Sequence, residues 1–167
     1  MPLSPLQLVT LRALVDRLIP ADEFPGALAA GTDAYVLRFL EPTPDSTTTA
    51  VLFQGLLLLD AEAAARHGHT ATFSALPPPD QDALLAALEE NRPAVPWPAS
   101  LSAAIFFNRF IDLAHEGFYA DPANGGNRSA ASWRMLGDDP RLPVSPISDV
   151  GEVPSPRDDS TAADTSA

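Results

Sequence analysis

The chain contains no cysteine and no lysine among its 167 residues. Without cysteine it forms neither a disulfide nor a thiolate metal site, and it has no cysteine nucleophile. This absence leaves the cellular compartment open, because a cysteine-free protein tolerates either redox state. All ten basic residues are arginine, which we interpret, together with the richness in alanine and proline, as a genomic bias.

Long apolar runs are also missing. The most apolar stretch, residues 50–59, is far shorter than the ~20 residues that a membrane-spanning helix needs. The first 20 residues contain no cationic start and no small-residue cleavage site, so we expect no signal peptide. The net charge of −12 argues against nucleic acid and anionic membrane surfaces as partners. We therefore expect a cytoplasmic protein without direct membrane insertion, the alternative being export together with a partner.

Strand-like alternation of apolar and polar residues is absent, and apolar residues recur at helical spacing instead. The pattern predicts helices over residues 5–19, 46–66, 80–91 and 128–136, a second helix capped by Thr32, and a fifth capped by Ser100 or Ser102 that runs to about Phe118. Apolar residues make up 46% of the chain, as in ordinary globular proteins. The predicted fold is all-α: a single bundle of five or six helices with antiparallel neighbours.

Two helices carry notable apolar patterns. Residues 50–59 are apolar on nearly every side, which is typical of a helix in the centre of a bundle or of one covered by a partner. The central position is the favoured interpretation. In the fifth helix, an apolar face is predicted from Ile105, Phe106, Phe110 and Leu113.

The composition changes after Gly137. Residues 138–167 hold seven acidic and two basic residues, a net charge of −5, and they also contain five prolines. Such a segment buries too little apolar surface to offset its ordering entropy, so we expect an extended or disordered acidic tail. Wrapping along a partner is the alternative. The predicted organisation is a helical domain over residues 1–137 and a flexible or partner-bound tail over 138–167.

Turn-forming residues gather between residues 117 and 137. Asp121-Pro122 and residues 124–127 (Asn-Gly-Gly-Asn) favour a chain reversal, because Asn-Gly and Gly-Gly adopt positive φ at little cost. Asn127 can then cap the helix over 128–136, which Gly137 closes. The segment is either a connection between packed helices or a binding loop.

The aromatic residues of this segment favour a binding role. Phe118, Tyr119 and Trp133 flank the turn, and such side chains are the usual anchors of partner surfaces. The candidate partner-binding residues are Phe118, Tyr119, Asp121, Pro122, Gly125, Gly126, Asn127, Arg128 and Trp133.

No catalytic, cofactor or metal residues are predicted. The sequence has no nucleotide-binding glycine motif and no Gly-x-Ser-x-Gly. His67, His69 and His115 do not have the spacing of a zinc site. His115-Glu116 with Asp121 could be imagined as acid/base groups, but adjacent residues on a helix do not share a face.

Residues 118–137 resemble the C-terminal signature of the gluconate 2-dehydrogenase subunit 3 family. The shared features are the aromatic pair, Asp121-Pro122, Gly125-Gly126-Asn127 with Arg128, and then Trp133 and Gly137. Residues 14–22, Leu-Val-Asp-Arg-Leu-Ile-Pro-Ala-Asp, resemble the opening of the family. The resemblance covers about residues 5–137. Two features differ: the twin-arginine export signal that is usual in the family is not seen, and Gly137-Asp-Asp-Pro replaces a Phe-Pro-Gly-like ending.

The resemblance implies a non-catalytic small subunit of a flavin-dependent sugar or sugar-acid dehydrogenase or oxidase. Its large partner would be a flavoprotein of the glucose-methanol-choline type that carries FAD, and a cytochrome c is a frequent third member. The small subunit would support folding, assembly or cofactor loading of the large one. The alternative is a stand-alone helical protein that binds a small ligand through Trp97, Phe106, Phe110 and His115.

Overall fold

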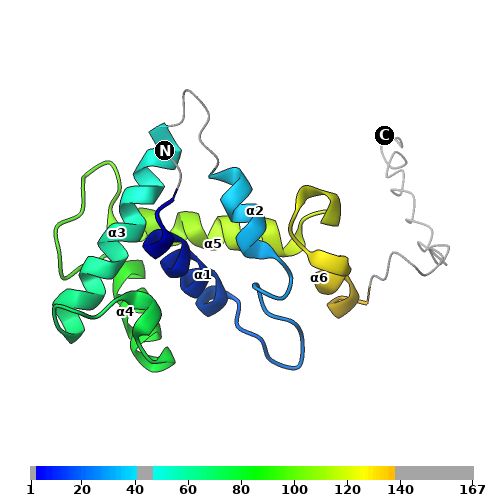
Figure 1. Cartoon of the computed structure of the whole chain (residues 1–167), viewed down its shortest axis with the longest axis horizontal. Coiled ribbons are helices and arrows are strands. Elements are labelled where there is room, and N and C mark those ends of the chain that lie inside the picture. Colours follow the sequence, from blue (N-terminus) through cyan, green and yellow to red (C-terminus); the bar gives the residue numbers. More distant parts are fainter. Residues whose placement is uncertain (1–2, 41–46, 138–167) are drawn as a thin grey trace, which may run out of the picture.

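The computed structural model describes residues 3–40 and 47–137. Within these ranges the chain forms helices and no strand, so the predicted all-α fold is confirmed (Figure 1). The α-helices are α1 Pro5–Leu18, α2 Thr32–Phe39, α3 Thr47–His67, α4 Pro78–Glu89, α5 Ala103–Tyr119 and α6 Ala131–Met135, and the 3-10 helices are η1 Phe73–Ala75, η2 Pro122–Asn124 and η3 Arg128–Ala130. The predicted acidic tail lies outside the described residues.

Serine caps begin α1 and α5. The Ser4 side chain accepts a hydrogen bond from the backbone N–H of Gln7, and the Gln7 side chain accepts one from the Ser4 N–H, which makes a complete capping box. Ser102, not Ser100, caps α5, and its hydroxyl accepts the N–H of Ile105 at 3.3 Å.

The ends of two helices differ from prediction. Gly31, with φ of 74°, is the cap of α2, and Thr32 is its first helical residue. α4 begins at Pro78 instead of residue 80, because proline is tolerated in the first helical turn where the N–H has no helical partner. It ends at Glu89 instead of residue 91, since Asn91 adopts the left-handed conformation, with φ of 53°.

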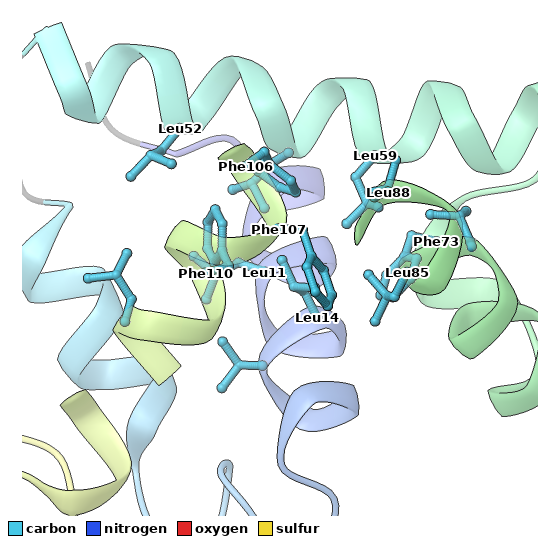
Figure 2. Packing of buried hydrophobic residues seen from close by; sticks show 14 of the residues in the cluster. Leu11, Leu14, Leu52, Leu59, Phe73, Leu85, Leu88, Phe106, Phe107 and Phe110 are labelled. Atoms are coloured by element: carbon cyan, nitrogen blue, oxygen red, sulfur yellow. The ribbon is translucent and has the colours of Figure 1, made fainter. Parts of the chain in front are cut away.

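The core is assembled around α5, which packs against α1, α2 and α4. Figure 2 shows leucines of α1, α3 and α4 gathered about the phenylalanines of α5. Phe106 and Phe110 are fully buried, with ring centroids 4.8 Å apart. The rings of Trp97 and Phe106 lie 5.2 Å apart, so the aromatic residues form a filled interior.

α3 reaches the core through a glycine. A Cβ at Gly55 would lie 2.2 Å from Cδ2 of Phe106, so only glycine allows α3 to approach the ring this closely. Leu52, Leu56 and Leu59 are buried, which confirms the central position of this helix for one face. Leu57 remains 50% exposed.

The predicted apolar face of α5 is wrong at Ile105, because this side chain is 52% exposed and does not pack in the core. The face that packs inward contains Phe106, Phe107, Phe110 and Leu113 instead. The helical spacing of apolar residues predicts an apolar stripe on α5, but which edge of this stripe is buried depends on where the neighbouring helices pack.

The elements are distributed along the length of α5 (Figure 1). α3 and α4 lie near its beginning, and α2 and α6 lie near its end. α3 crosses α5 in this view, so these two helices are not antiparallel neighbours. The candidate loop begins at the C-terminal end of α5 and leads to α6.

Candidate functional site

The loop between α5 and α6 closes on the end of α5. The backbone N–H of Asn127 donates to the carbonyl oxygen of Gly117 at 3.0 Å. Gly126 is buried against this carbonyl, and a Cβ there would lie only 2.1 Å from the Gly117 oxygen. Gly125 takes a positive φ of 96°. The Gly-Gly pair therefore serves two needs, since one glycine permits the turn and the other permits close backbone contact.

The Asn127 side chain fastens this closure. It is fully buried, and its Nδ2 donates to the carbonyl oxygen of Ala120 at 2.9 Å. Its Oδ1 accepts the backbone N–H of Ser132 at 2.9 Å. One carboxamide thus joins the end of α5 to the beginning of α6, satisfying a carbonyl and an N–H that lie outside regular helical pairing.

The predicted helix over 128–136 is interrupted. Ser129 and Ala130, within η3, adopt positive φ angles of 58° and 53°, so no continuous α-helix runs from residue 128 and α6 begins only at Ala131. Asn127 does act as a cap, but for the later helix, because its side chain bonds the second residue of α6. Gly137 ends the segment in the left-handed region as predicted, with φ of 83°.

Two further contacts hold the loop. The backbone N–H of Arg128 donates to the Ala30 carbonyl oxygen at 2.6 Å, which ties the loop to the connection between α1 and α2. The Asp121 carboxylate accepts the N–H of Ala123 at 2.8 Å and so begins the turn at Pro122. The loop is consequently anchored at both sides of its turn.

The aromatic residues of the loop divide between the interior and the surface. Phe118 is buried in a small apolar cluster with Ala30 and Ala131. Tyr119 meets the Phe118 ring edge-on and is 44% exposed. Trp133 is half-buried, and its indole N–H donates to the Tyr119 carbonyl oxygen at 3.2 Å. We call the surface made by Tyr119, Trp133 and the 67% exposed Leu136 the aromatic edge.

The nine predicted partner-binding residues therefore all belong to the end of α5, the α5–α6 loop and α6, but they do not all face outward. Phe118, Gly126 and Asn127 are buried; Pro122 and Trp133 are half-buried; Tyr119, Asp121, Gly125 and Arg128 are exposed. The buried three shape the loop, and the side chains available to a partner come from five of the others, since Gly125 has none.

A family model now decides the assignment. The model of gluconate 2-dehydrogenase subunit 3 matches residues 5–139. The chain belongs to the gluconate 2-dehydrogenase subunit 3 family. The family's name is that of one subunit in a multi-subunit oxidoreductase, so the chain is a subunit of this kind. Among curated proteins and solved structures, none matches the chain.

The residues that carry the subunit 3 signature have a structural explanation here. Gly126, Asn127 and Arg128 make backbone or side-chain contacts that close the loop, and Trp133 hydrogen-bonds its far side. In this chain, the residues that resemble the family signature therefore fix the shape of the loop.

Glu62, a fully buried carboxylate on α3, is not among the predicted site residues. It accepts the N–H groups of Ala94 and Val95 at 2.8 and 3.0 Å and the Trp97 indole N–H at 3.0 Å, and it pairs with Arg66 at 3.1 Å. Burial by itself raises the pKa of Glu62, but these hydrogen bonds outweigh it and hold the pKa below its ordinary value. The signal in the sequence was an acidic residue on the inward face of an apolar helix.

Two hollows lie outside the core. One of about 320 Å³ between α1, α4 and α5 has the apolar residues Leu85, Phe107 and Ile111 in its wall and His115 at its side. The other, of about 260 Å³, is lined by Tyr35, Arg38, Phe39 and Asn124. Because Asn124 belongs to η2, this second hollow adjoins the loop.

The other candidate groups are dispersed. His67 lies 3.7 Å from Asp80, and within residues 3–40 and 47–137 no three acidic or histidine side chains gather as a metal site would require. No ion pair joins His115 to Glu116 or Asp121 in this part of the chain. Nor does any helix of the described residues have the length and apolar character needed to cross a membrane.

The alternative ligand pocket is not formed by the residues named for it. The Phe106 ring packs at a tilt against both Trp97 and Phe110, and His115 lines the hollow beside α4 instead. Since filled aromatic packing leaves no room for a ligand between these rings, the arrangement does not favour that alternative.

Proposed function

We propose that this chain is a non-catalytic small subunit of a flavin-dependent dehydrogenase or oxidase that acts on sugars or sugar acids. Its partner is a large flavoprotein of the glucose-methanol-choline type, which carries the FAD, and a cytochrome c is a further member of the complex. The small subunit supports folding, assembly or FAD loading of the large one. The observation that carries the proposal is the family match over residues 5–139.

The aromatic edge supports a role in binding. Trp133 is held in place by its indole hydrogen bond, while part of its surface stays open to a partner. A rigid, partly exposed aromatic side chain loses little conformational entropy when it is buried in an interface. Tyr119 and Leu136 extend the same apolar surface.

Co-purification from the native source tests the proposal. The tagged chain should bring down a flavoprotein with stoichiometric FAD, identified by mass spectrometry and by flavin absorbance. A chain that purifies as a stable monomer without any flavoprotein would overturn the assignment.

Trp133→Ala then tests the aromatic edge. Truncating one well-packed anchor typically costs ~2–4 kcal/mol of binding, a loss of about 30- to 1000-fold in affinity. We expect lower recovery of the complex and less FAD-loaded enzyme, with activity per loaded enzyme nearly unchanged. Leu6→Ala, at an exposed apolar residue on α1, is the matched control. Circular dichroism must show that both variants are folded, and equal recovery of wild type and a folded Trp133→Ala would remove Trp133 from the interface.

A further inference from the structure

The arginines of this chain divide into two groups. Four of the eight in the described residues form ion pairs with carboxylates: Arg12 with Asp33, Arg17 with Asp82, Arg66 with Glu62 and Arg92 with Glu90. The other four, Arg38, Arg109, Arg128 and Arg134, have no carboxylate of the described residues within 4.0 Å. These four belong to α2, α5, η3 and α6, and α2 and α6 lie towards the same end of the molecule (Figure 1).

Arg38 and Arg109 both lie near Phe39, Arg109 through a contact with its ring and Arg38 through a shared hollow. The guanidinium carbon of Arg109 is 5.4 Å from the centroid of the Phe39 ring, so its planar group lies over the ring. Arg38 precedes Phe39 and lines the hollow of about 260 Å³ with Tyr35 and Asn124. We call Arg38, Phe39 and Arg109 the arginine pair surface.

An arginine without a carboxylate partner among the described residues is unexpected in a chain with a net charge of −12. Three acidic residues, Asp112, Glu116 and Asp121, belong to α5 and the loop that follows, and none of them pairs with these guanidinium groups. Stacking on a ring leaves the donors at the edge of a guanidinium free, and these donors match the two oxygens of a carboxylate.

We propose that Arg38 and Arg109 receive carboxylate groups of the large subunit, so that the arginine pair surface is part of the interface. This inference rests on the proposed function. Asn124 joins the hollow to the loop, which makes the arginine pair surface continuous with the segment that carries the aromatic edge. The aromatic edge supplies apolar contact, and the arginines supply charge complementarity that selects the partner and its orientation.

The absence of lysine offers a direct test. Arg38→Lys, Arg109→Lys and the control Arg92→Lys each introduce one lysine into a lysine-free chain. A water-soluble carbodiimide, applied to the purified complex, couples an amine to a carboxylate only where the two are in contact. Mass spectrometry of the cross-linked peptides then identifies the carboxylate.

We expect the amines introduced by Arg38→Lys and Arg109→Lys to be linked to aspartate or glutamate residues of the flavoprotein. The amine introduced by Arg92→Lys should be linked to Glu90 of the same chain, which verifies the chemistry at a site away from the interface. Links from positions 38 and 109 only to the chain's own acidic residues or to a second copy, or no links there while Arg92→Lys reacts, would overturn the inference.

The affinity of the complex provides a second readout. Arg38→Gln/Arg109→Gln should raise the Kd for the flavoprotein by about 10-fold at low salt, and the difference should shrink as salt screens the charges. Arg92→Gln, which removes one of the positive charges outside the arginine pair surface, should leave the Kd nearly unchanged. If wild type and the double variant bind the flavoprotein equally, the inference fails and the proposed function stands. If the wild-type chain binds no flavoprotein, both fail.

Discussion

Asn127 and Glu62 each use one buried polar side chain to hold an irregular segment. Asn127 bonds a carbonyl and an N–H on opposite sides of the α5–α6 loop. Glu62 accepts two successive N–H groups and an indole N–H from the connection between α4 and α5. Backbone groups outside helices need partners when they are buried, and these two side chains supply them.

Replacing Asn127 should open the loop. Asn127→Ala removes both side-chain hydrogen bonds, leaves the Ala120 carbonyl and the Ser132 N–H without them, and puts alanine at a φ of 44°. We expect the free energy of unfolding to fall by about 3 kcal/mol, measured by urea denaturation. The control Asn124→Ala, at an exposed residue of the same loop, should change it by less than about 0.5 kcal/mol. Equal effects of the two variants would contradict the role of Asn127.

Glu62 should make stability depend on pH. Its folded pKa lies below the ordinary value of 4.5, so the ionised form is the one that folding favours. The stabilisation of the folded state by ionised Glu62 is fully present above the unfolded pKa and is lost as the pH falls through the folded pKa. Wild type should therefore exceed Glu62→Gln in stability at pH 7, and the gap should narrow below about pH 4.5 in urea unfolding. A gap that is constant from pH 7 to pH 3 would argue against this linkage.

Among the elements, α3 and α5 show how one small residue fixes a helix crossing. Gly55 lets the α3 backbone lie against the Phe106 ring, and Phe106 in turn packs on Trp97 and Phe110. In an exposed helix, alanine is preferred over glycine by about 1 kcal/mol. At this crossing, close packing opposes that preference.

Gly55→Ala should therefore destabilise the protein in spite of its better helix propensity. The new methyl group would lie 2.2 Å from Phe106 Cδ2, and both α3 and the ring are held by the core. We expect a net loss of about 1–2 kcal/mol, seen as a lower thermal midpoint in circular dichroism. Gln54→Ala, at the exposed neighbour, should leave the midpoint nearly unchanged. A higher midpoint for Gly55→Ala would show that the helices separate at little cost.

The α5–α6 loop is an element of a different kind, because its shape comes from backbone contacts. Gly117, Gly126 and Asn127 bring the two ends together, and Arg128 joins them to Ala30. A loop fixed in this way presents Trp133 in one orientation. This preorganisation lowers the entropy lost on binding and is consistent with a loop that serves a partner.

At the scale of the whole molecule, the arginines differ in whether they pair with carboxylates of the same chain. The Arg66 and Arg92 guanidinium groups pair with carboxylates of α3 and its surroundings. Arg38 shares a hollow with Asn124 of the loop, and Arg109 lies over the Phe39 ring that lines the same hollow. Neither guanidinium group has a carboxylate partner among the described residues, in contrast to Arg66 and Arg92.

The helical domain should fold without the acidic tail. Both apolar clusters of the described residues lie between Leu3 and Met135. We expect a chain that ends at Gly137 to keep the helical far-ultraviolet circular dichroism and the thermal midpoint of the full chain. Loss of cooperative unfolding in the shortened chain would contradict the predicted boundary at residue 137.

Patterns in the sequence were sufficient to predict the first five α-helices and to indicate the family. Helix formation is local: Ser4 and Ser102 cap from within four residues, and apolar residues repeat with the helical period. These signals lie within a few positions of each other, so they can be found without a structure. The same holds for residues 118–137, whose resemblance to the family signature, together with that of residues 14–22, indicated the family that the comparison confirmed.

Only the tertiary structure decided which side of each pattern faces inward. Ile105 belongs to the apolar stripe of α5 but is exposed, whereas Asn127 belongs to a polar turn and is buried. Glu62 finds its partners at residues 94–97, and Arg128 finds Ala30. Burial and pairing of this kind depend on segments that are distant in the chain and meet only when the helices pack, so no local pattern contains them.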